Sequence, residues 1–190
     1  MIKETQQPIK EDLDLTQHLV INAVGKDQPG IVNTLSLSIF DAQCNIIDSR
    51  MAVLGGEFAI ILLVSGSDQA ITTLATHLDD AAKKLDLTIT TKTTSTRQAS
   101  ETLVPYTIEA IALDHPGIVY QLASFLSNKQ INIENLTTES YAAAHTGSPM
   151  FAVTMTVGIP AAQKINALRD EFTEFCNELN IDTTFKPAKG

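Results

Sequence analysis

Two short segments carry the residue types that could hold a charged small molecule. They read Asp-Gln-Pro-Gly-Ile-Val at residues 27–32 and Asp-His-Pro-Gly-Ile-Val at residues 114–119, so five of the six positions are identical. A carboxylate accepts hydrogen bonds from an ammonium group, and a glycine lets a ligand approach the main chain without meeting a Cβ atom. If each segment opens a helix, the unpaired N–H groups there can hold a carboxylate. The two segments therefore suit a zwitterion such as an amino acid.

The same segments also have a purely architectural interpretation. Asp-x-Pro-Gly is a good helix-initiating turn, because Asp caps helices and Pro29 suits the first helical turn, where its missing N–H would be unpaired anyway. Asp27 and Asp114 thus have two roles open to them: capping their own helix or accepting from a ligand. Asn45 and Asn132, each at the start of a later strand, could complete a ligand site that lies between two units.

The residues around the first segment predict alternating strands and helices. Alternating side chains indicate a strand at 18–24, followed by a helix that ends near residue 41 and a strand from 45 to about 54. Gly55 and Gly56 predict a tight hairpin turn, and a strand at 58–64 returns from it. The predicted buried stripe of the first helix comprises Ile31, Val32, Leu35 and Ile39.

A second helix and a last strand complete the first unit. Ser67 or Asp68 can cap this helix, and a Thr-rich strand follows at 87–93. The apolar stripe of the helix comprises Ile71, Leu74, Ala75, Leu78, Ala82 and Leu85. The order β-α-β-β-α-β predicts an α+β fold of the ferredoxin-like kind, a four-stranded antiparallel sheet with both helices on one face.

The second half of the chain repeats this order. The first helix recurs 87 residues later and the last helix 94 residues later, because the hairpin at 141–149 is longer than the Gly55-Gly56 turn by about six residues. The sequence therefore predicts two domains, at 17–94 and 104–186. Residues 95–103 are the predicted linker, and residues 1–16 are a polar N-terminal arm.

The sheet faces away from the helices differ between the two predicted units. The first carries Val20, Val24, Ile61 and Leu63, whereas the second carries Thr107, Glu109, Ile111, Thr154 and Thr156. An uncovered face of an antiparallel sheet is normally polar. We therefore predict that the first face is an interface, covered by a second chain in a homodimer or by the other unit.

Composition and charge exclude several classes of function. The net charge is −9, and neither half has a basic face, which argues against direct nucleic-acid or membrane binding. The chain has no secretory signal and no apolar run of about 20 residues, so we expect a cytoplasmic protein with reduced, buried Cys44 and Cys176. No histidine pair has metal spacing and no nucleophile stands beside a base. We therefore expect no enzyme activity, metal or cofactor.

The duplicated loop motif, with Asn-Ile entering the second strand of each half, resembles tandem ACT domains, the amino-acid-sensing modules of many biosynthetic enzymes. A chain of two ACT domains and nothing else further resembles the bacterial glycine cleavage repressor family. That resemblance implies a repressor that contacts a LysR-type transcriptional activator instead of DNA, with glycine as the favoured effector. It places ligand contacts on Asp27, Gln28, Pro29, Gly30, Ile31, Val32 and Asn45, and on Asp114, His115, Pro116, Gly117, Ile118, Val119 and Asn132.

Three other functions fit the same topology less well. An acylphosphatase-like hydrolase would want an arginine in the first loop, and 26–32 and 113–119 contain none. An RNA-binding module would want aromatic residues on the open face of the central strands, where Val, Thr, Asn and Ile stand. A constitutive protein–protein adaptor with no small ligand remains the alternative. The difference between Gln28 and His115 also leaves open whether both loops bind.

Overall fold

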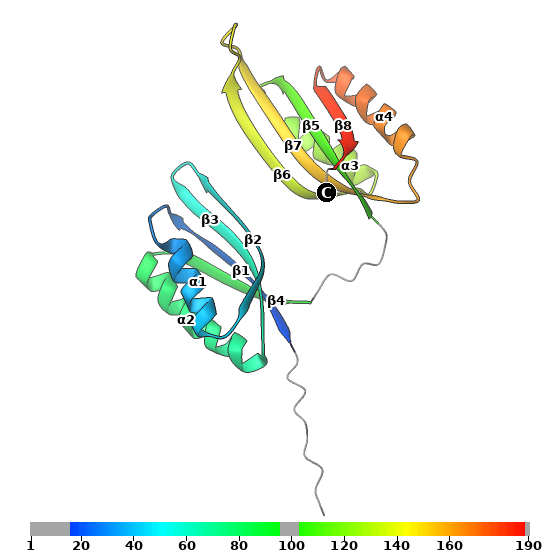
Figure 1. Ribbon diagram of the computed structural model, residues 1–190. Helices are drawn as coiled ribbons and strands as arrows, with labels where there is room; N and C mark the ends of the chain where they lie inside the picture. The colour runs from blue at the N-terminus through cyan, green and yellow to red at the C-terminus, as the bar shows by residue number, and fades with distance from the viewer. Residues whose placement is uncertain (1–15, 96–102, 189–190) are drawn as a thin grey trace, which may run out of the picture. The chain divides into compact units, whose positions relative to one another are not determined.

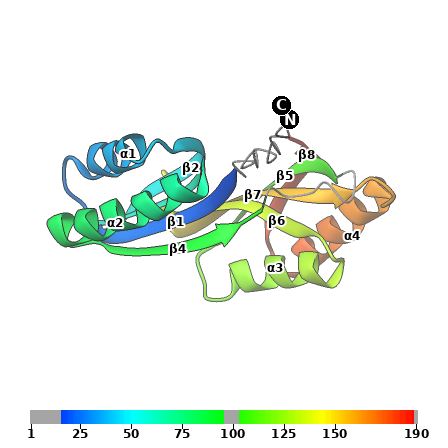
Figure 2. The same ribbon diagram turned by 90° about the horizontal axis from the view of Figure 1, so that it is seen from below.

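The computed structural model describes residues 16–95 and 103–188, and the chain divides between Arg97 and Gln98 into two units (Figure 1). Unit 1 contains β1 (Gln17–Lys26), α1 (Ile31–Asp41), β2 (Asn45–Leu54), β3 (Glu57–Gly66), α2 (Asp68–Leu85) and β4 (Thr88–Thr94). Its strands form one antiparallel sheet in the order β2-β3-β1-β4, with α1 and α2 on the same face (Figure 2). The predicted arm, apart from residue 16, lies outside the described residues, as does most of the predicted linker.

Unit 2 has the same architecture. It contains β5 (Leu103–Leu113), α3 (Ile118–Asn128), β6 (Asn132–Ala142), β7 (Pro149–Pro160), α4 (Ile165–Glu178) and β8 (Asp182–Pro187), with the sheet order β6-β7-β5-β8. The predicted fold, two ferredoxin-like units with antiparallel sheets, is confirmed. β5 begins at Leu103, the last residue assigned to the linker from the sequence.

Alternation along the central strands builds the core of each unit. In unit 1, Leu19, Ile21 and Ala23 of β1 are buried beside Phe58 and Ile60 of β3, and they face the helices. Burying such a side chain contributes roughly 1.5–3 kcal/mol. Gly55 and Gly56, in the turn that joins β2 to β3, have φ values of 62° and 92°, so the predicted glycine turn is confirmed.

Four details of the predicted elements were wrong. Val32, expected on the buried stripe of α1, is 43% exposed. Pro29 precedes α1, because Gly30 is the N-cap with φ 96° and the helix begins only after it. On α2, Ala81 is buried, whereas Ala75 is exposed and Ala82 is half-buried. A methyl group offers too little apolar surface to decide which side of a helix faces the core. The predicted cap of α2 is confirmed, since Ser67 Oγ accepts a hydrogen bond from the Ala70 N–H at 3.2 Å.

The thiols are also less alike than predicted. Cys176 is buried in the core of unit 2, but Cys44 is only half-buried at the end of the turn that follows α1. Burial raises the pKa of Cys176 to about 11, and it raises the pKa of Cys44 as well. Among residues 16–95 and 103–188, no helix combines the length and apolar character needed to cross a membrane.

Candidate functional site

The two repeated loops have the same backbone geometry. Each follows the first strand of its unit and is tied to the neighbouring hairpin: the Asp27 N–H donates to the Gly56 carbonyl at 3.0 Å, and the Asp114 N–H donates to the Pro149 carbonyl at 2.9 Å. These bonds hold each aspartate at one end of the sheet of its own unit, where β1 leads to α1 and β5 leads to α3. The duplication therefore extends from sequence to main-chain hydrogen bonding.

The glycine of each loop has a conformation that other residues avoid. Gly30 has φ 96° and ψ −6°, and Gly117 has φ 103° and ψ −7°. A Cβ atom added at either position would meet no atom within 4 Å, so the main chain there is open to approach. Glycine is needed at these positions for backbone conformation, and it also leaves space beside the helix N-terminus.

The aspartates do not cap the helices that follow them. α1 and α3 both begin without a side-chain cap and without an acidic residue in the first turn. α4 likewise lacks a side-chain cap, but its N-cap residue, Lys164, is not in the left-handed conformation. The first-turn N–H groups of α1 and α3 therefore have no side-chain acceptor from the cap position. Of the two roles open to Asp27 and Asp114, helix capping is wrong.

Gln28 and His115, which distinguish the two loops, make different contacts. Gln28 Nε2 donates to the carbonyl oxygen of Leu85 at 2.9 Å, at the end of α2. His115 Nδ1 lies 3.1 Å from the carbonyl oxygen of the adjacent Pro116 and makes only a local contact. Gln28 thus has a structural partner that its position in the motif did not indicate.

Around the second loop the surface is hollowed into a cavity of about 620 Å³. Ser140 Oγ of β6 donates to Asp114 Oδ2 at 3.3 Å. The cavity is lined by Asp114, His115, Pro116, Gly117, Ile118, Val119, Tyr120 and Phe151. Sequence reasoning missed Tyr120 and Phe151; Tyr120 directly follows the motif, whereas Phe151 comes from β7. Ile31 and Ile118 are buried in the cores, so only their main chains could contact a ligand.

The predicted asparagines do not lie beside the loop of their own unit. Asn45 pairs with Ser65 of β3, while the Asp27 loop follows Lys26, which pairs with Glu57 at the other end of β3. Those eight steps along an antiparallel strand span about 27 Å. Asn132 borders a separate cavity of about 410 Å³ with Ser127 and Gln130. Within one unit, the structure does not bring the asparagine and the loop together.

The predicted interface residues lie on the face of the unit 1 sheet opposite the helices, called here the helix-free face. Ile61 is 48% exposed and Val24 is 38% exposed, while Val20 and Leu63 are half-buried. On the matching face of unit 2, Ile111 is 40% exposed, but its neighbour Glu109 is in a polar network: Glu109 Oε2 accepts from Thr184 at 2.9 Å and from Lys186 at 3.0 Å. The hydrogen bond from Lys186 is the main reason that the pKa of Glu109 is lowered.

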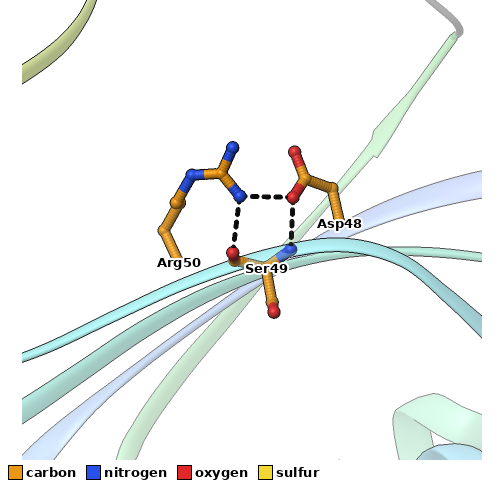
Figure 3. A network of polar contacts seen from close by, with 3 residues as sticks. All are labelled: Asp48, Ser49 and Arg50. Carbon is orange, nitrogen blue, oxygen red and sulfur yellow. Dashed lines mark hydrogen bonds and ion pairs between the residues drawn. The ribbon is translucent and has the colours of Figure 1, made fainter. Parts of the chain in front are cut away.

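A cavity of about 360 Å³ lies on the helix-free face and is lined in part by Asp48, Ser49 and Arg50 of β2. Figure 3 shows the polar contacts among these three residues. Arg50 Nη1 donates to Asp48 Oδ1 and to the Ser49 carbonyl (2.7 Å), and the Ser49 N–H donates to Asp48 Oδ1 (2.8 Å). The arginine hydrogen bond lowers the pKa of Asp48. Because Arg50 is already bonded within its own strand, the apolar floor of Val20, Ile61 and Leu63 remains the main feature of this cavity.

Comparison with known proteins agrees with this geometry. A model of the ACT domain family matches residues 17–92, the whole sheet and both helices of unit 1 apart from the end of β4. The glycine cleavage system transcriptional repressor of Escherichia coli K12 is 32% identical over 168 residues, which cover 88% of each chain. The chain belongs to the ACT-domain family of glycine cleavage system transcriptional repressors. The repressor of Shigella flexneri has the same identity and coverage.

Two solved structures match nearly the whole chain. One is provisionally assigned as a glycine cleavage system transcriptional repressor; it has a TM-score of 0.71 and 30% identity, covering 93% of this chain and 99% of its own. The other, from Galdieria sulphuraria and of unknown function, has a TM-score of 0.79 and 27% identity, covering 92% and 100%. Membership of this repressor family supports a regulatory role for the chain.

Proposed function

We propose that the chain is an amino-acid-responsive repressor of the glycine cleavage system that acts through contact with a transcriptional activator of the LysR type. Glycine is the effector we favour, and we propose no catalytic activity. The observation that carries the sensing part is the pair of uncapped helices, each opening at a left-handed glycine three residues after an aspartate that does not cap it.

The loop chemistry suits the two charged ends of an amino acid. First-turn N–H groups at Gly30 or Gly117 can bind the carboxylate, favoured by the partial positive charge of the helix N-terminus. The carboxylate of Asp27 or Asp114 can accept from the ammonium group. Ile31 and Ile118 are turned into the cores and offer a ligand side chain no apolar contact, whereas Val119, Tyr120 and Phe151 line the cavity at the second loop. We favour glycine because this chain is similar to repressors of the glycine cleavage system.

Thermal denaturation with a panel of amino acids tests the sensing. A ligand present at 100 times its Kd stabilises the protein by about 2.7 kcal/mol, which raises the melting temperature measurably. We expect glycine to do so and larger amino acids to do so less. Asp27→Asn and Asp114→Asn, compared separately, report which loop binds. If no amino acid shifts the transition at millimolar concentration, the sensing proposal is wrong.

The alternative is a constitutive adaptor with no small ligand, and the activator separates the two. We expect the purified activator, bound to its operator, to retain the chain in the absence of glycine and to release it when glycine is added. Retention that glycine does not alter would favour the adaptor. Direct binding of the chain to operator DNA without the activator would contradict the proposed mechanism, in which the chain acts through the activator. The net charge of −9 opposes such binding to DNA.

A further inference from the structure

A groove between α1 and α2 of unit 1 is open where the matching part of unit 2 is filled. Its volume is about 220 Å³, and Leu37, Ser38, Asp41, His77, Asp80 and Ala81 are among its lining residues. At its floor, His77 Nδ1 lies 3.3 Å from the Ser38 carbonyl, so this nitrogen carries the proton that the carbonyl accepts. The side chains that meet here are short or polar, which leaves the groove unfilled.

In unit 2 the same helix pair is closed by aromatic side chains. Phe125 takes the position of Ser38, and its ring lies 5.2 Å from that of Phe172 and 5.0 Å from that of Phe175. Phe175 of α4 corresponds to Ala81 of α2, 94 residues earlier. Lys129 lies over the Phe125 ring and forms an ion pair with Glu171, the counterpart of His77. The fold therefore does not require an open groove, because its second copy is built without one.

Leu37, which lines the groove, and Phe40, one turn away on α1, are apolar side chains that the fold does not use; together they are called here the rim. Leu37 is 52% exposed and Phe40, one turn further along α1, is 75% exposed. At the corresponding positions of α3, unit 2 has Ser124 and Ser127. Large apolar side chains that are exposed beside a cavity are typical of interaction surfaces, whereas serine is depleted at such surfaces.

The charge of the groove identifies the kind of partner. Asp41 is the last residue of α1, which has no basic residue in its final turn, so a carboxylate adds to the negative end of the helix dipole. No ion pair among the described residues includes Asp41. Asp80 on the opposite wall is only loosely paired with Lys83, at 3.9 Å. Lys84 also lines the groove, but the two carboxylates outnumber it, so a cationic group would still be stabilised near Asp41 and Asp80.

We propose that this α1–α2 groove is a docking site for a helical segment of a protein partner, one that inserts an apolar side chain beside Leu37 and Phe40 and places a lysine or arginine near Asp41 and Asp80. The proposal rests on the part of the proposed function in which the chain acts through another protein. It does not depend on amino-acid sensing. It assigns the contact to the helical face of unit 1, distinct from the two loops and from the helix-free face.

Two synthetic helical peptides with identical leucine positions test the docking directly, one with lysine and one with glutamate at every polar position. We expect the lysine peptide to bind the full chain in a calorimetric titration and the glutamate peptide to bind at least about tenfold more weakly. Ser38→Phe introduces the residue of unit 2, and Leu37→Ser with Phe40→Ser removes the rim. Each of these variants should lower the affinity for the lysine peptide by about tenfold or more.

The control is Met51→Ser, which removes a similarly exposed apolar side chain (55% exposed) from β2 and should leave peptide affinity unchanged. Circular dichroism establishes that each variant is folded; the Leu37/Phe40 variant changes only exposed positions and keeps the test valid if Ser38→Phe misfolds. Equal binding of the two peptides, or undiminished binding by the folded rim variant, would overturn the proposal. So would a change in the solution mass of the rim variant, since the groove would then hold a second copy.

The purified activator distinguishes this inference from the proposed function. If it binds the wild-type chain and the Met51→Ser control but not the rim variant, the groove is its docking site. If it binds the rim variant as tightly as the wild type, the groove is not a docking site for this partner and the proposal fails. If the peptide results hold but the activator does not bind the wild-type chain, the docking surface stands and the proposed partner is wrong.

Discussion

Gln28 and Leu85 join the first loop to the far end of α2 through a hydrogen bond of 2.9 Å from the side-chain amide to the backbone carbonyl. The Leu85 carbonyl belongs to the last turn of the helix, where carbonyl groups lack helical partners. The bond therefore stabilises a helix end and the candidate ligand loop at once. In unit 2, His115 makes only a local contact with Pro116.

Replacing Gln28 with Ala should destabilise unit 1 by about 0.5–1.5 kcal/mol, the usual worth of one hydrogen bond. The matched control is His115→Ala, whose local contact should leave urea denaturation of unit 2 nearly unchanged. Equal effects of the two substitutions would show that the bond to Leu85 contributes nothing.

Replacing Gly30 or Gly117 with Ala should cost roughly 1–2 kcal/mol, because the residue is held at positive φ. Since a Cβ atom there meets no neighbour, the cost is conformational, and Asn should be tolerated better than Ala. At Gly25 Ala should be tolerated better than Asn, because a Cβ atom would lie 2.9 Å from the Asp86 carbonyl oxygen and a larger side chain would clash more. Denaturant midpoints of the variants give the order.

The buried thiol of Cys176 should make stability depend on alkaline pH. Its pKa is raised to about 11 in the folded chain from an ordinary value of 9.0, so the folded state holds the proton more tightly. This contribution is complete below pH 9 and is lost as pH rises from 9 to 11. The difference in melting temperature between wild type and Cys176→Ala should change across that window. A melting-temperature difference that stays constant across this window would contradict the predicted pH dependence.

Thiol reagents should modify the half-buried Cys44 before the buried Cys176.

Introducing Ile61→Lys together with Leu63→Glu should reduce self-association without unfolding unit 1. Ile61 is exposed and Leu63 is half-buried on the helix-free face, so the charges remain in contact with water. Light scattering of both proteins over a range of concentrations measures the effect. An unchanged mass in a folded variant would show that this face does not join two chains, and the predicted interface would fail in its dimeric form.

Much of the fold could be predicted because its signals are local. Alternation in β1, the Gly55-Gly56 turn and the Ser67 cap each depend on neighbouring residues, and all three are confirmed. The errors fall where the burial of a small side chain or the exact helix start depends on packing, as at Ala75, Ala82 and Pro29.

The candidate site was only partly predictable for the same reason. The motif located both loops, because a duplicated strand-to-helix turn is visible in the residues themselves. It did not indicate that Tyr120 and Phe151 border the second loop, since Phe151 reaches it from another strand. It also did not indicate that Gln28 is bonded to Leu85, 57 residues away.

The sequence by itself determined the two units, the order of their strands and helices, and the positions of the two loops, because periodicity and turn residues act over a few neighbouring positions. The tertiary structure decided which of these features meet. It placed Asn45 at the opposite end of its sheet from Asp27, and it left the α1–α2 groove open at Ser38 where Phe125 fills the equivalent space. Such relations depend on how strands register and helices pack, which no short stretch of residues specifies.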